Sequence, residues 1–226
     1  MTEPGFQESE RFRTRMVSRD IRQAGVRSRR VLDAMMAVPR ELFVPSGTSL
    51  AAAYGDHPMP IGFGQTVSQP FIVALMIEML ELGRGSRVLE VGTGSGYQTA
   101  VLACMGVEIV TLEVIPELAA GARRTVTEVV PGGSVRYLVA DGYLGWEPAS
   151  PYDGIIVSAS PEKVPEALER QLSPDGGRLV IPVGGFLQKL VRVTRSGNDL
   201  SMEESLPVRF VPLVRQCGER NGERLR

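Results

Sequence analysis

Three acidic side chains, each at the end of an apolar run, are the groups in this chain best placed to bind a ligand. Glu90 lies in the run 87–91, Glu113 follows the run 107–112, and Asp141 follows the run 135–140. Ligands of open α/β sheets bind outside the carboxyl ends of the strands. Any one of these acids alone could be a solvated turn residue or a helix cap. The three together favour a binding site.

The first acid is followed at once by a glycine-rich turn, Gly92-Thr93-Gly94-Ser95-Gly96. Glycines after a buried strand let a ligand approach the backbone closely. The spacing is G-x-G-x-G, and a dinucleotide fingerprint starting at Gly92 would need a small residue where Tyr97 stands. Glu113 comes 21 residues after Gly92, where a carboxylate accepts hydrogen bonds from ribose hydroxyls. The pattern therefore favours a nucleoside ligand without a pyrophosphate, such as S-adenosyl-L-methionine.

Alternating elements must position these residues. Strands are expected at 86–91, 107–112, 135–140, 154–159 and 177–183, separated by helices at 97–105, 116–129 and 161–172. Such alternation predicts parallel strands with helical crossovers. The strand-like stretches 187–194 and 201–214 flank a turn cluster at 196–199, which predicts a C-terminal antiparallel hairpin.

The first 82 residues have a different pattern. Helical spacing occurs at 8–24, 28–38 and 69–82, and the Pro- and Gly-rich stretch 45–64 predicts an irregular loop. Ser68 is expected to cap the helix that starts at Gln69-Pro70. The fold class is thus α/β and Rossmann-like, with a mostly parallel sheet and an N-terminal helical extension. We expect one domain over 1–226, with helices and a substrate loop in 1–82 and the core in 83–214.

Composition narrows the functional classes. The 226 residues carry a formal net charge of −1, so no global field favours nucleic acid or an acidic membrane. One histidine and two cysteines without ligand spacing disfavour a metal site. No apolar run is long enough to span a membrane, and the first residues are polar. We expect a cytoplasmic monomer that binds neither nucleic acid nor membrane.

A second segment, Pro60-Ile61-Gly62-Phe63-Gly64-Gln65-Thr66-Val67-Ser68-Gln69-Pro70, lies directly upstream of the cofactor-type fold. Together with 88–97, 38–45, 141–142, 144–146, 151–153, 182–184 and 207–213, it makes the chain resemble the protein-L-isoaspartate (D-aspartate) O-methyltransferase family. The resemblance runs collinearly over about residues 10–214. The glycine loop alone indicates only a class I methyltransferase, and the segment 64–70 is the more specific part. The chain departs from the commoner family pattern at Phe63, Tyr143 and 158–161.

The resemblance implies a role for each matching residue. Thr66 and Ser68 would stand at the acceptor carboxylate, with Ser68 as the family's active-site serine. The positions implied for S-adenosyl-L-methionine are Glu90, Gly92, Thr93, Gly94, Ser95 and Gly96 at its methionine end, Glu113 at its ribose, and Val114, Asp141 and Gly142 around adenine. The segments 183–184 and 208–213 would frame a peptide substrate. The implied reaction methylates L-isoaspartyl, and possibly D-aspartyl, residues of damaged proteins to start their repair, and releases S-adenosyl-L-homocysteine.

The residue types suit this chemistry. An aspartyl-type carboxylate has a reference pKa of about 4, so it is ionised at neutral pH and needs no general base. A serine hydrolase is disfavoured because there is no G-x-S-x-G elbow, and the only histidine, His57, lies in a Pro-rich loop. Two alternatives stay open. The chain could methylate a normal aspartate of a dedicated peptide during maturation, or it could bind S-adenosyl-L-methionine without catalysis.

Overall fold

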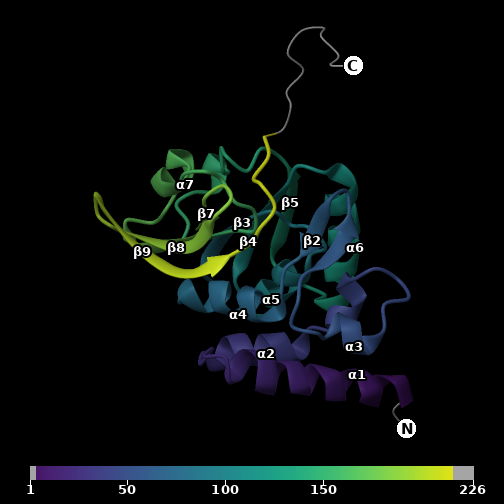
Figure 1. The fold of residues 1–226 in the computed structure, drawn as a ribbon. Coiled ribbons are helices and arrows are strands. Elements are labelled where there is room, and N and C mark those ends of the chain that lie inside the picture. The colour runs from purple at the N-terminus through teal and green to yellow at the C-terminus, as the bar shows by residue number, and fades with distance from the viewer. Residues whose placement is uncertain (1–3, 216–226) are drawn as a thin grey trace, which may run out of the picture.

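A seven-stranded sheet forms the centre of the computed structural model, which describes residues 4–215 (Figure 1). Its strands are, in spatial order, β5 (Val135–Val139), β4 (Glu108–Glu113), β3 (Arg87–Val91), β6 (Gly154–Val157), β7 (Asp175–Val183), β8 (Gln188–Ser196) and β9 (Asp199–Val208). The first five are mutually parallel, whereas β8 and β9 are antiparallel to their neighbours. This confirms the predicted parallel core with an antiparallel end.

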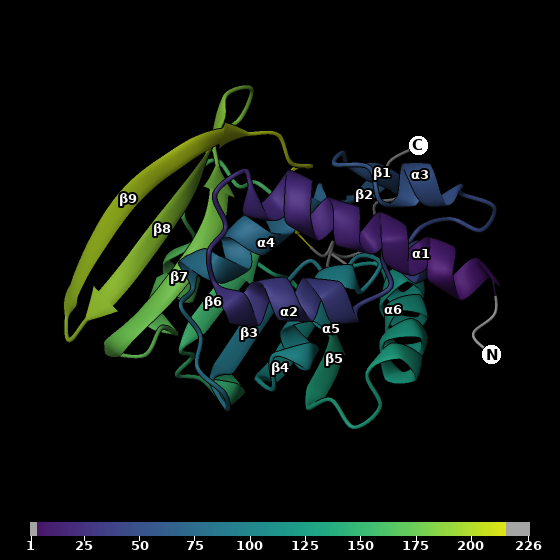
Figure 2. The ribbon, with the colours of Figure 1, turned by 90° about the horizontal axis from the view of Figure 1, so that it is seen from below.

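Helices cover the sheet and form a further layer outside it. The helical elements are α1 (Pro4–Arg15), η1 (Met16–Arg22, a π-helix), α2 (Arg29–Ala37), η2 (Arg40–Phe43), α3 (Leu50–Ala53), α4 (Pro70–Met79), α5 (Tyr97–Cys104), α6 (Pro116–Val129), η3 (Glu147–Ala149) and α7 (Glu166–Arg170). Helices α4 and α5 lie against the sheet, and α1 and α2 lie outside them, as Figures 1 and 2 show. The N-terminal extension therefore packs onto the helical layer and not onto the sheet.

The region before α4 contains more regular structure than its composition predicts. Residues 45–64 were expected to be irregular, but they include α3 and the strand β1 (Met59–Gly62), which pairs antiparallel with β2 (Gln65–Val67). These elements are only three or four residues long, so no periodicity can reveal them. The β1–β2 hairpin depends instead on its turn, in which Phe63 has a φ of 54° between two glycines of positive φ.

Two helices also differ from their predicted extents. The helix expected at 161–172 shortens to α7, because Pro165 lacks the amide that a helix running through that position would need and serves as the N-cap instead. The helix expected at 8–24 continues past α1 as the π-helix η1. The strand expected at 201–214 is β9 and ends six residues earlier than predicted, at Val208. The other predicted strands and helices lie within a few residues of their expected bounds.

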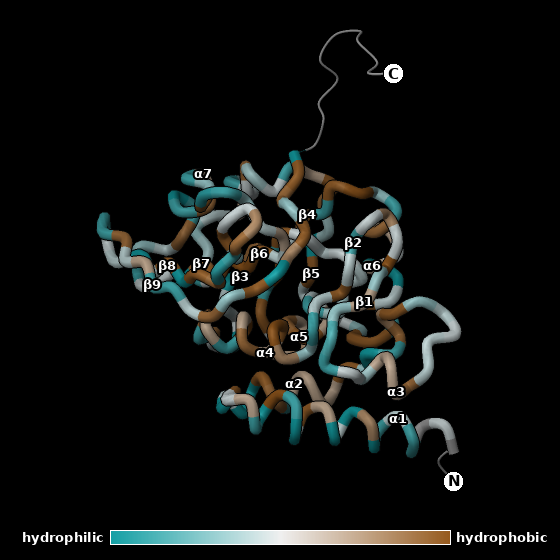
Figure 3. Tube along the Cα trace, in the orientation of Figure 1, coloured by the Kyte–Doolittle hydropathy of each residue, from teal (hydrophilic) through white to brown (hydrophobic). Residues whose placement is uncertain are grey.

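The inner strands are buried on both faces. Every residue of β6 is buried, as are four of the five in β3. Burying a large aliphatic side chain contributes about 1.5–3 kcal/mol, so these runs supply much of the stability. In the hydropathy-coloured trace, hydrophobic stretches lie along inner elements such as β6 and α5, whereas α1 is largely hydrophilic (Figure 3). Over residues 4–215 no helix combines the length and apolarity needed to cross a bilayer.

Gly96, at the N-cap of α5, should be the least replaceable residue of the glycine turn. It has a φ of +87°, and an added Cβ would lie 2.8 Å from Val126 Cγ2 and 3.0 Å from Ala122 Cβ of α6. Gly132 has a similar φ of +82° with no atom within 4 Å of an added Cβ, so it serves as the matched control. We expect Gly96→Ala to lower the free energy of unfolding by about 1–3 kcal/mol more than Gly132→Ala, because only the former overpacks. Urea unfolding measures both, and equal losses would contradict the packing argument.

Candidate functional site

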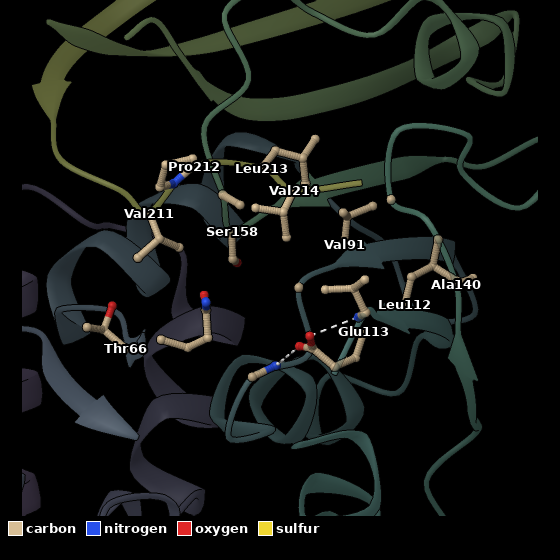
Figure 4. Close-up of a pocket in the computed structure, with 16 residues that line it drawn as sticks. Thr66, Val91, Leu112, Glu113, Ala140, Ser158, Val211, Pro212, Leu213 and Val214 are labelled. Atoms are coloured by element: carbon tan, nitrogen blue, oxygen red, sulfur yellow. Dashed lines mark hydrogen bonds between the residues drawn. The ribbon is translucent and has the colours of Figure 1, made fainter. Parts of the chain in front are cut away.

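A cavity lies at the carboxyl ends of β3, β4, β5 and β6, where the sequence places the three acids (Figure 4). Its walls come from five parts of the chain: Val91, Gly92 and Gly94; Leu112, Glu113 and Val114; Ala140 and Gly142; Ser158 and Ala159; and Val211, Pro212, Leu213 and Val214. Gln65 and Thr66 of β2 close the remaining side. The cavity is mostly apolar with a few convergent polar groups, as small-molecule sites usually are.

The glycine turn forms one wall with its backbone. Gly92 and Gly94 both have positive φ, at 91° and 55°, and present no side chain to the cavity. The β1–β2 hairpin covers this turn, because Ile61 Cδ1 lies 3.5 Å from the position of a Cβ on Gly94. A ligand in the cavity would therefore lie between the turn and the hairpin.

Glu113 is the one acidic side chain among the residues that line the cavity. Its Oε2 accepts a hydrogen bond from the Gly94 amide at 2.9 Å, and its Oε1 accepts from the amides of Val114 and Ile115 at 2.9 and 3.1 Å. Figure 4 shows the carboxylate between the turn and the end of β4. A carboxylate offers about four lone-pair sites, and these three amides use three of them, so one acceptor site remains for a ligand hydroxyl. This geometry suits the ribose role that the resemblance implies.

Glu90 lies elsewhere than we expected. It does not line the cavity but is fully buried beneath the glycine turn. Its carboxylate accepts hydrogen bonds from Gln98 at 3.0 Å, Thr99 at 2.6 Å and Thr111 at 2.7 Å. Burial is the largest influence on its pKa and raises it to about 7, although the three hydrogen bonds oppose that shift.

The Glu90 network reaches the glycine turn through Thr93. The hydroxyls of Thr93 and Thr111 are 2.6 Å apart. When Glu90 is ionised, Thr111 gives its one proton to that carboxylate, so Thr93 is the donor to Thr111. Glu90 therefore supports the turn from below, and its influence on a ligand is through the conformation of that turn.

Four other residues predicted to bind the cofactor also do not line the cavity. Asp141 is flanked by the lining residues Ala140 and Gly142, and its Oδ1 accepts a hydrogen bond from the Tyr143 amide at 2.9 Å. Thr93, Ser95 and Gly96 belong to the glycine turn without lining the cavity. Of the ten predicted cofactor positions, the structure thus brings five to the cavity wall: Gly92, Gly94, Glu113, Val114 and Gly142.

A second hollow, a groove of about 450 Å³, adjoins the first. The residues that line this groove are Pro58, Thr66, Ser68, Gln69, Phe71, Ile72 and the segment 206–210. Thr66 lines both the cavity and the groove, while Ser68 lines the groove alone. The segment after β9 likewise serves both, with 206–210 at the groove and 211–214 at the cavity.

Ser68 is not the N-cap that its position suggested. The N-cap of α4 is Gln69, whose side chain makes no capping bond. The capping function comes from Asp56, whose carboxylate accepts the Phe71 amide at 3.0 Å and the Gln69 side-chain amide at 2.7 Å. The Ser68 hydroxyl is consequently not committed to the helix. Asp56 comes from a loop 13 residues upstream of Gln69, so no local sequence pattern could identify it.

Ser158 is a further lining residue that the sequence argument passed over. It follows β6 and accepts a hydrogen bond from the Gln98 side chain at 3.1 Å. Gln98 also donates to Glu90, so the side-chain amide of this one residue of α5 links the ends of β3 and β6. Its position directly after a predicted parallel strand could have indicated a site residue, because residues at the ends of such strands meet at one edge of the sheet. Unlike the three acids, however, Ser158 carries no charge that distinguishes it in the sequence.

Comparison with known proteins identifies the family. The model of the family "Protein-L-isoaspartate(D-aspartate) O-methyltransferase (PCMT)" matches residues 11–218. The chain belongs to the protein-L-isoaspartate (D-aspartate) O-methyltransferase family. The protein-L-isoaspartate O-methyltransferase of Methylorubrum extorquens (strain PA1) is 51% identical over 208 residues, which cover 91% of this chain and 90% of the relative.

Two solved structures show the same fold. A protein-L-isoaspartate O-methyltransferase superposes with a TM-score of 0.81 at 29% identity, covering 91% of this chain and 67% of that one. A protein described as a putative protein-L-isoaspartate O-methyltransferase of Plasmodium falciparum, in complex with S-adenosyl-L-homocysteine, has a TM-score of 0.76 at 24% identity. That match covers 88% of this chain and 96% of the other. The Rossmann-like α/β fold of class I methyltransferases that the sequence predicted is confirmed.

The buried Glu90 should make the stability of this family member depend on pH. A pKa of about 7 in the folded state exceeds the unfolded value near 4.5, so the folded state keeps its proton over that interval. The contribution of Glu90 is therefore most favourable below about pH 4.5 and declines by up to about 3 kcal/mol as the pH rises through 7. Glu90→Gln removes this decline, so the variant should gain stability relative to the original chain between pH 5 and 8.

Urea unfolding at several pH values measures the difference. The surface substitution Glu128→Gln, at an exposed position near the end of α6, is the control and should show a difference independent of pH. A Glu90→Gln difference that is also flat from pH 5 to 8 would show that the carboxylate is ionised throughout.

Proposed function

We propose that this protein transfers a methyl group from S-adenosyl-L-methionine to the free carboxylate of an L-isoaspartyl residue in damaged proteins and peptides, and so initiates their repair. The observation that carries this proposal is the position of Thr66 between the two hollows. A donor in the cavity and an acceptor in the groove would meet at that residue. Family membership supplies the reaction class, and the two hollows supply places for both reactants.

The cavity residues fit S-adenosyl-L-methionine. Glu113 would accept hydrogen bonds from the ribose, Gly92 and Gly94 leave backbone space for the methionine end, and Val114 and Gly142 would border adenine. Glu90, Thr93, Ser95, Gly96 and Asp141 would act from behind these residues by holding the turns. When bound, the ligand supplies an electrophilic methyl group on a sulfonium and leaves as S-adenosyl-L-homocysteine.

The groove needs to align a carboxylate and does not need to activate it. An aspartyl-type acid is already ionised at neutral pH. Ser68 and Thr66 provide hydroxyl donors that would orient the carboxylate without becoming methylated themselves. Positioning of this kind contributes up to about 7–11 kcal/mol to lowering a barrier in favourable cases. Apolar groove residues such as Ile72 and Phe210 would exclude water from the acceptor.

The shape of the groove supports an unfolded or flexible segment as substrate. It is bordered by the extended segment 206–210 and by the start of α4, and it is open to solvent. We further propose that the protein acts as a monomer in the cytoplasm and that D-aspartyl sites would bind in the same groove. It would work as one unit over residues 1–226, with 1–82 supplying the acceptor loop, residues 65–71, and 83–214 the cofactor cavity.

The deciding experiment uses two synthetic peptides that differ only in isoaspartate or aspartate at one position. We expect radiolabelled methyl transfer from S-adenosyl-L-methionine to the isoaspartyl peptide alone, as base-labile label. Label on the aspartyl peptide would move the function to a dedicated maturation substrate. Label on neither, with S-adenosyl-L-homocysteine still bound, would support a non-catalytic binding role.

Substitutions in the groove and in the cavity should affect turnover and cofactor affinity separately. Ser68→Ala should lower turnover of the isoaspartyl peptide while leaving S-adenosyl-L-homocysteine affinity nearly unchanged. Glu113→Gln should weaken that affinity by about 1.5–3 kcal/mol, the usual contribution of hydrogen bonds to a charged group. Isothermal titration measures the affinities, and Glu108→Gln, at the opposite end of β4, is the control. Loss of cofactor affinity in Ser68→Ala would refute this division of roles.

A further inference from the structure

We propose that Arg40 is a positioning residue for methyl transfer, whose guanidinium fixes Ser68 of the acceptor groove relative to the glycine turn of the cofactor cavity. The inference rests on the proposed function, because it concerns the distance between the two reactants. Arg40 lines neither hollow and would not touch either reactant. It would act through the backbone of Ser68 and the ring of Tyr97.

The contacts of Arg40 join three segments that are distant in sequence. Its Nη2 donates to the carbonyl oxygen of Ser68 at 2.9 Å, and its Nε donates to that of Ala53, the last residue of α3, at 2.9 Å. Its Cζ lies 4.7 Å from the centroid of the Tyr97 ring. Tyr97 is the first residue of α5 and follows Gly96 directly. One side chain thus connects the acceptor loop to the end of the glycine turn.

A contribution to folding stability does not by itself explain why the positively charged Arg40 is buried here. The Arg40 side chain is 0% exposed, and no ion pair within residues 4–215 includes it. Its Nη1 has no hydrogen-bond partner. Moving a charge out of water is unfavourable by several kcal/mol unless partners compensate, and apolar side chains of similar volume often stabilise such sites better. What the guanidinium offers that an apolar side chain lacks is a fixed geometry between two carbonyls and a ring.

Other contacts hold the chain on both sides of Ser68. Asp56 binds the side chain of Gln69 and the amide of Phe71, immediately after Ser68. On the side before Ser68, β2 pairs with β1. The Ser68 carbonyl is the point between these two supports, and Arg40 is the side chain that holds it. A loop fixed at three successive points can keep the Ser68 hydroxyl at one place in the groove.

Lysine cannot reproduce this arrangement. Arginine presents a planar fork that donates in fixed directions and stacks on an aromatic face, whereas the lysine ammonium is a point charge on a flexible stem. Arg40→Lys therefore keeps the positive charge and removes the geometry. Displacement of a reacting group by about 1 Å can reduce a rate by about a hundredfold.

We expect Arg40→Lys to lower kcat for the isoaspartyl peptide by about 10- to 100-fold, with a smaller change in KM and with S-adenosyl-L-homocysteine affinity within about threefold. The matched control is Arg13→Lys. Arg13 is also buried, donates to the backbone carbonyls of Met36 and Ala37, and has an unpartnered nitrogen, but it forms no hydrogen bond with residues 65–71 and does not stack on Tyr97. Arg13→Lys should keep kcat when both variants are assayed below their unfolding temperatures.

Hydrogen exchange of the backbone amides in residues 65–71 tests the same inference without any turnover. We expect faster exchange there in Arg40→Lys than in Arg13→Lys, and equal exchange in β3 and β4. A kcat within twofold of the original, unchanged exchange at 65–71, or a loss of kcat in step with cofactor affinity would overturn the role of Arg40. Inactivity of the original chain on isoaspartyl peptide would instead refute the proposed function, and the exchange comparison would still decide the role of Arg40 in holding the loop.

Discussion

The parallel pairing of β3 with β4 on one side and β6 on the other is the constraint on which the site depends. In this register Glu90 lies beside Thr111 and Ile156, and the carboxyl ends of the three strands meet at one edge. The turns that follow them must then share one space. Two backbone bonds, from the Gly92 and Thr93 amides to the Leu112 carbonyl, at 2.8 and 3.2 Å, extend the pairing into the glycine turn. The cavity is the space left between these turns.

A polar network inside an apolar core keeps this turn in one conformation. Glu90 is surrounded by buried strands and helices, and a buried acid is tolerated only where hydrogen bonds replace water. Gln98, Thr99 and Thr111 supply those bonds from α5 and β4, and Gln98 and Thr93 carry the network on to Ser158 and the glycine turn. Partly satisfied networks are unfavourable, so any arrangement of the turn that breaks one of these bonds is disfavoured. The glycine turn that forms one wall of the cavity is thus held in place by the buried side chains of Glu90, Thr99 and Thr111, which do not line the cavity.

The acceptor loop has a different kind of support, because it lies outside the sheet. The two-stranded β1–β2 hairpin is too small to be stable by itself. It contacts the glycine turn at Gly94, and the residues that follow it are held by Arg40 at Ser68 and by Asp56 at Gln69 and Phe71. The N-terminal layer contributes to the site through Arg40 of η2. Tyr97 packs against Phe43 with ring centroids 5.7 Å apart and lies under Arg40, which joins the N-terminal layer to the core.

The sequence by itself determined the elements whose signal is local and long. Apolar runs, the glycine spacing and helix-length periodicity predicted the parallel core, the hairpin after β7 and the cofactor edge with Glu113, and the segment 60–70 indicated the family. Tertiary structure alone decided the rest. Glu90 has the residue type and position of a ligand-binding acid, yet the register of β3 turns it into the core. Ser68 has the type of an N-cap, yet Asp56 from another loop takes that function. The short elements α3, β1 and β2 span only three or four residues each, which is too short for a periodic pattern to predict them.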